Sequence, residues 1–276
     1  SVDWLYTRIE IDGEQLDLAT SEFEDFVREI DMKTGILTRS FVWKTKSGKR
    51  LAVKFERFVS MTQVKRTTQK ITIKPIGFSG EIYITSGLDF SQIHRNERKN
   101  LWDCKPGTIE KGEDIFMGID GTTINTKLKV YSSCKVNAEY ESLEEVNEEK
   151  IVAVKLKANL EDGKDYVLTK VTNNVTLRDD GDLAVYDKEV EAVKSETETA
   201  CTLYDKLEKE NIDWWKKVWD SSDITIANDP ENQQGIRFCI FQMYQTYHGA
   251  VEGTNIGAKG LTGEAYNGNA FWDTET

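Results

Sequence analysis

The sequence predicts an antiparallel β-sandwich at the N-terminus followed by helices, and two observations carry that prediction. Up to about residue 180, short segments alternate between apolar and polar residues with a period of two, the spacing of a strand with one buried face. After Asp179-Asp-Gly-Asp182 the composition shifts to Glu, Lys, Ala and Thr, and the apolar period lengthens to that of a helix. We therefore predict a sandwich over residues 1–180, a helical linker over 181–222 and a further domain that begins at 223 and runs to 276.

The strand pattern is clearest between Ile151 and Leu160, where alternate apolar residues share one face while Lys155 and Lys157 face water. Further strands are predicted over 37–43, 51–55, 69–74, 81–85 and, more weakly, 126–131. Chain reversals are expected at four turn-forming pairs, Ser47-Gly48, Ser79-Gly80, Asp120-Gly121 and Asp162-Gly163. Many short strands separated by turns are typical of a sandwich.

Helical periodicity takes over after residue 182. Apolar residues recur at helical spacing in two sets, Ala200, Leu203, Tyr204 and Leu207, then Trp214, Trp215, Val218 and Trp219. We interpret the tryptophans as a packing stripe rather than as a platform for a sugar. Another helix is predicted to begin where Asp229 can cap it and Pro230 fits its first turn. Its predicted buried stripe is Ile236, Cys239, Ile240, Met243 and Tyr247.

Composition and charge argue against several classes of partner. The chain has 276 residues and a formal net charge of −12, which repels nucleic-acid phosphates and anionic membranes alike. The longest apolar runs fall far short of the roughly 18 residues of a membrane span. The first residues, Ser1-Val-Asp-Trp-Leu-Tyr6, lack the basic and apolar regions of a secretory signal, so we expect a cytoplasmic protein.

The cysteines and histidines do not form a metal-binding pattern. Cys104, Cys134, Cys201 and Cys239 are widely spaced, with no C-x-x-C pair, and the histidines are His94 and His248. We expect four free thiols, most of them buried as small hydrophobic side chains in a reducing cytosol.

The C-terminal stretch from Ile256 to Thr276 combines glycines, aromatic rings and carboxylates more densely than any other segment. Aromatic faces pack against the C–H faces of a sugar ring, and a fixed carboxylate such as Asp273 accepts hydrogen bonds from its hydroxyls. Tyr266, Phe271 and Trp272 supply the rings beside it. The alternative is a glycine-rich loop in which Phe271 and Trp272 are ordinary core residues.

Motifs spread over nearly the whole chain resemble glycoside hydrolase family 65, the inverting α-glucoside phosphorylases that act on maltose, trehalose, kojibiose and nigerose. The C-terminal motifs are Ile256-Gly-Ala-Lys-Gly-Leu-Thr-Gly-Glu264 and Phe271-Trp-Asp-Thr-Glu275. Others are Asp31-Met-Lys-Thr-Gly-Ile-Leu-Thr-Arg-Ser-Phe41, Ser47-Gly-Lys-Arg50, Glu56-Arg-Phe-Val-Ser60, Phe78-Ser-Gly80, Trp214-Trp215, Trp219, Asp229-Pro230 and Arg237-Phe238. The resemblance implies that residues 223–276 are the beginning of an (α/α)6 catalytic barrel.

The resemblance also implies an activity and a donor site. A disaccharide and inorganic phosphate would give β-glucose 1-phosphate and a released sugar, without a metal or organic cofactor. Trp272 and Asp273 would contact the donor glucose, with Phe271 and Tyr266 beside them. The general acid would lie beyond Thr276, not at Glu264, Asp273 or Glu275. It implies too that this chain is the N-terminal part of a homodimeric enzyme, inactive without the missing C-terminal barrel.

Two other functions remain open from the residues alone. An inverting α-glucoside hydrolase would need a second carboxylate to hold water, whereas a phosphorylase uses phosphate as the nucleophile. A non-catalytic carbohydrate-binding or structural module would need no reactive group. In addition, Asn267 and Asn269 stand where some relatives have a basic or imidazole side chain, which leaves the linkage and the acceptor open.

Overall fold

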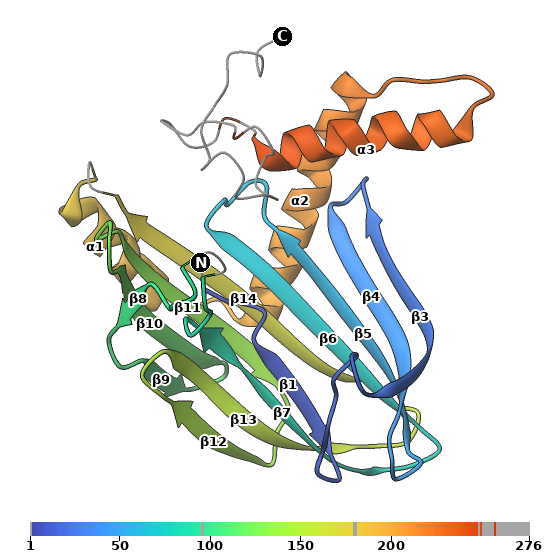
Figure 1. Ribbon diagram of the computed structural model, residues 1–276, viewed down its shortest axis with the longest axis vertical. Helices are drawn as coiled ribbons and strands as arrows, with labels where there is room; N and C mark the ends of the chain where they lie inside the picture. The colour runs from blue at the N-terminus through green and yellow to red at the C-terminus, as the bar shows by residue number, and fades with distance from the viewer. Residues whose placement is uncertain (1, 95–96, 179–180, 248, 250–256, 258–276) are drawn as a thin grey trace. The chain divides into compact units, whose positions relative to one another are not determined.

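The computed structural model describes residues 2–94, 97–178, 181–247, 249 and 257. Contacts divide the chain into two compact units, which we describe separately. Unit 1 contains Ser1–Ile30 and Ile36–Glu208, and unit 2 contains Asp31–Gly35 and Lys209–Thr276. The division falls within helix α2 (Ala200–Ser222), which therefore contributes to both units (Figure 1). The domain boundaries at residues 180 and 222 stay predictions.

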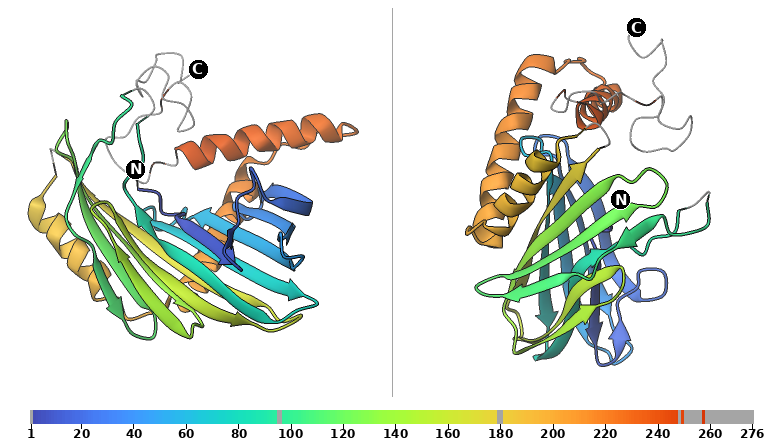
Figure 2. Two further views of the ribbon diagram at one scale, coloured as in Figure 1. Left: turned by 60° about the horizontal axis from the view of Figure 1, so that its bottom comes forward. Right: turned by 90° about the vertical axis from the view of Figure 1, so that its left-hand side faces the viewer.

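Unit 1 is a sandwich of two antiparallel sheets, as predicted (Figure 2). The five-stranded sheet consists, in spatial order, of β12 (Ser142–Asn147), β13 (Ile151–Leu160), β7 (Gly80–Asp89), β1 (Thr7–Ile11) and β2 (Glu14–Gln15). The nine-stranded sheet consists of β3 (Glu22–Asp31), β4 (Ile36–Lys44), β5 (Arg50–Val59), β6 (Arg66–Ile76), β14 (Tyr166–Leu177), β11 (Lys129–Ala138), β10 (Ile115–Thr123) and β8 (Trp102–Cys104), with β9 (Thr108–Lys111) also on β10.

The sandwich core forms because the inward positions of both sheets are apolar. The strand predicted over 151–160 is β13, and its inward residues Val152, Val154 and Leu156 are fully buried. They pack in one cluster with Trp43 and Leu51 of the nine-stranded sheet. Burying a side chain of this size stabilises the fold by about 1.5–3 kcal/mol, so the alternation read from the sequence accounts for this core.

The predicted reversal at Asp120-Gly121 is wrong, because both residues lie inside β10. A glycine in a strand interior often marks a close approach of another group rather than a turn. At Gly121, a Cβ atom would lie 2.9 Å from the ring of Phe90 and 3.2 Å from that of Trp102. Gly121 is therefore needed for packing.

The strand predicted over 126–131 begins three residues later than expected, at Lys129, and extends to Ala138. The preceding residues form a turn closed by Thr123, whose amide donates to the Leu128 carbonyl at 2.9 Å. The Leu128 amide donates to the Thr123 hydroxyl at the same distance. Leu128 belongs to the turn because these bonds occupy its backbone groups.

Two helical segments pack on the outer face of the nine-stranded sheet in unit 1. Helix α1 (Leu183–Lys194) lies beside β14, with Asp182 accepting a hydrogen bond from the Ala184 amide as its N-cap (Figure 2). The first half of α2 buries Leu203 and Tyr204 against Phe58. The helical stripe predicted at Ala200, Leu203, Tyr204 and Leu207 is confirmed, since all four are buried.

Unit 2 contains the second half of α2, helix α3 (Pro230–Thr246) and the tip of the β3–β4 hairpin. The tryptophan stripe of α2 packs as predicted: Trp215 is 1% exposed and stacks on Phe241 of α3, with ring centroids 4.5 Å apart. The helix predicted at Asp229-Pro230 begins there, and the Asp229 carboxylate accepts from the Asn232 amide at 3.0 Å.

The predicted buried stripe of α3 is wrong for most of its members. Ile240 and Phe241 are the buried residues of this helix, whereas Cys239 is exposed and Met243 is 71% exposed. Phe241 is buried because the Trp215 ring covers it. Helical spacing alone does not say which side of α3 faces a neighbour.

Two hydrogen bonds and the close approach of the Trp215 indole to Gly35 hold the hairpin tip Asp31–Gly35 against α2 within unit 2. The Asn211 amide donates to the Thr34 carbonyl at 2.6 Å, and the Trp219 indole donates to the Met32 carbonyl at 2.7 Å. Gly35 has a φ of +72°, and a Cβ there would lie 2.3 Å from the Trp215 indole nitrogen. Glycine is required at this position both for its backbone conformation and for the close indole.

The cysteines are free, as expected, but most are not buried. Cys134 is buried, Cys104 is half-buried, and Cys201 and Cys239 are exposed. Burial raises the pKa of Cys134 to about 11, which makes its thiol a core group rather than a nucleophile. None of the described helices combines the length and the apolar composition of a membrane span.

Candidate functional site

The four residues predicted to hold a sugar, Tyr266, Phe271, Trp272 and Asp273, lie outside the described residues. Their roles stay predictions. Among the other motif residues, two groups that the structure describes bear on a site, namely those around the start of α3 and those on the inner face of the sandwich.

Residues around the start of α3, including the motif residue Arg237, have structural roles. Arg237 donates two hydrogen bonds to the Asp223 carboxylate, at 2.8 and 2.7 Å. This pairing lowers the pKa of Asp223, chiefly through the hydrogen bond from Arg237. Gln233 accepts from the Ile226 amide and donates to the Ile224 carbonyl, both at 2.7 Å. These bonds order the connection between α2 and α3, which precedes the glycine-rich stretch.

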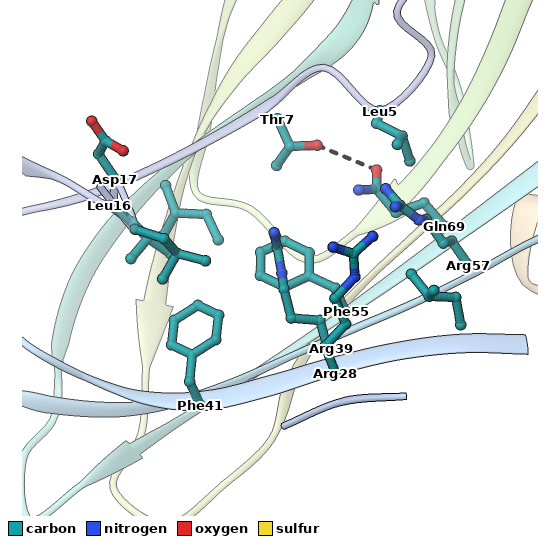
Figure 3. A pocket seen from close by; sticks show the side chains of 13 residues that line it. Leu5, Thr7, Leu16, Asp17, Arg28, Arg39, Phe41, Phe55, Arg57 and Gln69 are labelled. Carbon is teal, nitrogen blue, oxygen red and sulfur yellow. Dashed lines mark hydrogen bonds between the residues drawn. The ribbon is translucent and has the colours of Figure 1, made fainter. Parts of the chain in front are cut away.

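The inner face of the sandwich carries a cavity of about 400 Å³ in unit 1, which we call the arginine cavity (Figure 3). One wall comes from β1 and the segment after β2, and the other from β3, β4, β5 and β6. Its lining residues are Leu5, Thr7, Ile9, Leu16, Asp17, Leu18, Arg28, Leu37, Arg39, Phe41, Phe55, Arg57 and Gln69.

Strand alternation places three guanidinium groups in this cavity, one from each of three neighbouring strands. Arg28 lies on β3, Arg39 on β4 and Arg57 on β5. In the β4–β5 register Leu37 is opposite Arg57 and Arg39 is opposite Phe55. The Arg39 guanidinium lies over the Phe55 ring, 4.5 Å from its centroid.

The cavity combines these charges with apolar walls and a neutral polar group. Burial lowers the pKa of Arg39, and the charges of Arg57 and Arg28 lower it further. Gln69, only 4% exposed, accepts a hydrogen bond from the Thr7 hydroxyl at 3.3 Å (Figure 3). Such a pocket can orient a small anionic molecule.

Sequence reasoning missed this cavity although the pattern that forms it was available. Leu37, Arg39, Phe41 and Trp43 alternate along one predicted strand, so a period of two places them on one face. An arginine among inward apolar residues is the signal that could have drawn attention to it.

The structure does not assemble a metal centre in the part of the chain it describes. No group of three or more His, Cys, Asp or Glu side chains comes together there.

Comparison with known proteins identifies the chain's family. The model of the glycosyl hydrolase family 65 N-terminal domain matches residues 1–218, and that of the family's central catalytic domain matches residues 237–276. An α,α-trehalose phosphorylase from Thermoanaerobacter brockii is 30% identical over 97% of this chain and 35% of its own length. A maltose phosphorylase from Bacillus subtilis is 31% identical over 96% of this chain and 35% of its own length.

A solved structure from the human microbiome, provisionally named as a kojibiose phosphorylase, superimposes with a TM-score of 0.85 at 30% identity. The match covers all of this chain and 36% of that one. The chain thus spans about a third of the length of the relatives it matches. It belongs to glycosyl hydrolase family 65, of which it contains the matched N-terminal domain and the matched segment of the central catalytic domain.

Proposed function

We propose that the protein carrying this chain cleaves an α-linked glucose disaccharide with inorganic phosphate and inverts the anomeric centre. The products would be β-glucose 1-phosphate and a free sugar. The observation that carries the proposal is the match of both family 65 domain models, together with relatives named as phosphorylases of trehalose, maltose, kojibiose and nigerose. The candidate substrates are therefore these four disaccharides.

The chemistry needs few groups. An inverting reaction requires an acid that protonates the leaving oxygen and a nucleophile on the opposite face of the sugar ring. In a phosphorylase the nucleophile is phosphate itself, so inorganic phosphate is a co-substrate and the reaction needs no metal or organic cofactor. We assign donor-glucose contacts to Trp272 and Asp273, with Phe271 and Tyr266 forming the adjacent wall. We place the general acid beyond Thr276.

The described residues contribute order within unit 2, where the Arg237–Asp223 pair fixes the connection between α2 and α3. We further propose that the protein is a cytoplasmic homodimer. The free cysteines fit a reducing compartment.

The proposal is tested by incubating the intact gene product with maltose, kojibiose, nigerose or trehalose, with and without phosphate. Glucose 1-phosphate should form from one of these sugars only when phosphate is present. Release of free glucose at a rate that ignores phosphate would identify a hydrolase instead. Absence of turnover with all four, combined with weak sugar binding, would indicate a non-catalytic module.

The donor site has its own test in the same assay. Asp273→Ala should lower kcat/KM by at least about a hundredfold, because deletion leaves sugar hydroxyls unpaired in a closed site. Asp213→Ala is the matched control, since Asp213 is exposed on α2 and should be neutral. Equal kinetics for the two variants would remove Asp273 from the donor site.

A further inference from the structure

The arginine cavity concentrates positive charge in a chain whose net charge is −12. Arg28, Arg39 and Arg57 all line it, although nothing in the sandwich architecture requires cations on an inner face. Figure 3 shows the three guanidinium groups gathered on one side of the space. Their gathering therefore calls for an explanation beyond folding.

Protein carboxylates do not neutralise these charges. Among the described residues, no ion pair within 4.0 Å joins Arg28, Arg39 or Arg57 to an acidic side chain. Asp17 is the carboxylate among the lining residues, and its Oδ1 accepts from the Ala19 amide at 2.9 Å. Glu56, next in sequence to Arg57, lies on the other face of β5 and pairs with Lys54 at 2.7 Å.

The three cations are close enough to disfavour one another. The pKa of Arg57 is lowered by burial first and by the charge of Arg28 next, while Asp3 opposes this shift. Burial also lowers the pKa of Arg39 first, followed by the charges of Arg57 and then Arg28. A bound anion would attract every guanidinium group and so offset the repulsion among them.

A neutral donor in the cavity wall points to the same kind of ligand. The Gln69 side chain is 4% exposed, and its oxygen accepts from Thr7. Its amide nitrogen has no partner among the described residues, although it lies in the cavity wall beside Arg57 (Figure 3). An oxygen of a bound anion could accept a hydrogen bond from this amide nitrogen.

We propose that the arginine cavity binds a phosphate group, free or as the ester of a small molecule. A phosphate dianion offers several acceptor oxygens, which suits three guanidinium forks from three strands. The volume of about 400 Å³ lies within the range of small-molecule sites and exceeds what free phosphate needs. The Phe41 and Phe55 rings give the remaining space apolar walls suited to the carbon part of an ester.

This inference goes beyond the proposed function and does not depend on it. The cavity residues lie in the matched N-terminal domain, and none belongs to the donor site assigned to Trp272 and Asp273. Phosphorolysis is measured by turnover of a disaccharide, whereas the cavity is measured by equilibrium binding. Either result can fail without the other.

The test is calorimetric titration of the intact gene product with inorganic phosphate and, separately, with glucose 1-phosphate, at constant ionic strength set with chloride, comparing the wild type with cavity variants. Saturable binding is expected, and Arg39→Gln or Arg57→Gln should weaken it by about tenfold or more. Arg57→Lys keeps the charge but loses the planar fork, so it should bind more weakly than wild type and more tightly than Arg57→Gln. Arg57→Lys also replaces Arg57→Gln in the binding test if Arg57→Gln fails to fold.

Arg8→Gln is the matched control. Arg8 is exposed on β1, so this substitution removes the same charge outside the cavity. It should bind as wild type does. Tighter binding of glucose 1-phosphate than of phosphate would identify an ester site, and equal binding a site for the phosphate group alone.

Three outcomes would overturn the proposal. The first is absence of saturable binding up to about 20 mM ligand. The second is an equal loss of phosphate affinity in Arg8→Gln and Arg57→Gln. The third is equal phosphate affinity of wild type and Arg57→Gln in the intact gene product. The last result would mean that the rest of the protein occupies the cavity.

Discussion

Two regions of the same inner face of the nine-stranded sheet differ in what they bury. Trp43, Leu51 and Ile71 are fully buried in one core with residues of the five-stranded sheet. Farther along the same strands, Arg39 and Arg57 line a cavity instead. Alternation therefore decides which side chains share a face, but the opposite sheet decides whether that face becomes a dry core or a binding surface.

Cations in the two regions show the same difference. Lys170 is fully buried between the sheets, and its ammonium group donates to the carbonyl oxygens of Gly87 and Tyr6. Backbone dipoles thus compensate for its lost hydration. Arg39 has an aromatic ring beneath it and open cavity beside it. The lysine is a structural tie, whereas the arginines remain available to a ligand.

The largest change in stability should come from a substitution in the core around Trp43. Trp43→Ala is expected to lower the free energy of unfolding by about 3–5 kcal/mol, because it opens a cavity among fully buried neighbours. Urea titration measures this. Trp43→Phe is the control: it keeps a ring and removes the indole N–H, which has no partner among the described residues, so its cost should be far smaller. Similar losses for both variants would contradict dense packing at this position.

The next effect concerns pH and Lys170. Burial lowers the pKa of Lys170 in the folded state, so the unfolded chain binds more protons between that lowered pKa and about 10.5. Wild-type stability should therefore rise with pH relative to Lys170→Met in this window, by at most about 1.4 kcal/mol per pH unit. Urea titrations of both proteins from pH 7 to about 10.5 give the difference, and a flat difference would show that Lys170 stays charged throughout.

A smaller effect of opposite sign should appear in the arginine cavity. In phosphate-free buffer of low ionic strength, Arg57→Gln is expected to raise the free energy of unfolding by up to about 1 kcal/mol, because it relieves repulsion among three cations. Added sodium chloride should reduce the gain through screening. Thermal and urea unfolding at two salt concentrations measure it, and a loss of stability at low salt would mean that the cluster is already neutralised.

The smallest change in stability should come from Phe26, on strand β3 at the edge of the nine-stranded sheet. Phe26 on β3 is 44% exposed and stacks on Phe41 with ring centroids 6.2 Å apart. Phe26→Ala should cost less than about 1 kcal/mol, because half of the ring is already in water. Urea titration alongside Trp43→Ala would give the ratio of the two costs directly. A cost as large as that of Trp43→Ala would mean that the Phe26 ring is buried when the protein is in solution.

The periodic elements were predictable because their burial follows from local spacing. β13 has the predicted bounds, and α2 buries the predicted residues at Leu203 and Leu207. Position-specific errors arose where a distant residue decides the outcome. Gly121 is a glycine inside a strand because the Phe90 ring approaches it, and α3 buries Phe241 because Trp215 stacks on it. Neither neighbour is visible from local sequence.

By itself, the sequence determined the order of sandwich and helices, the family and the residues expected to hold the donor sugar, because these depend on periodicity and on motifs that are contiguous in the chain. The tertiary structure alone decided that Arg28, Arg39 and Arg57 meet in one cavity with Gln69. Strand pairing brings them together, and side chains so far apart along the chain acquire a common electrostatic environment only when the sheet has formed.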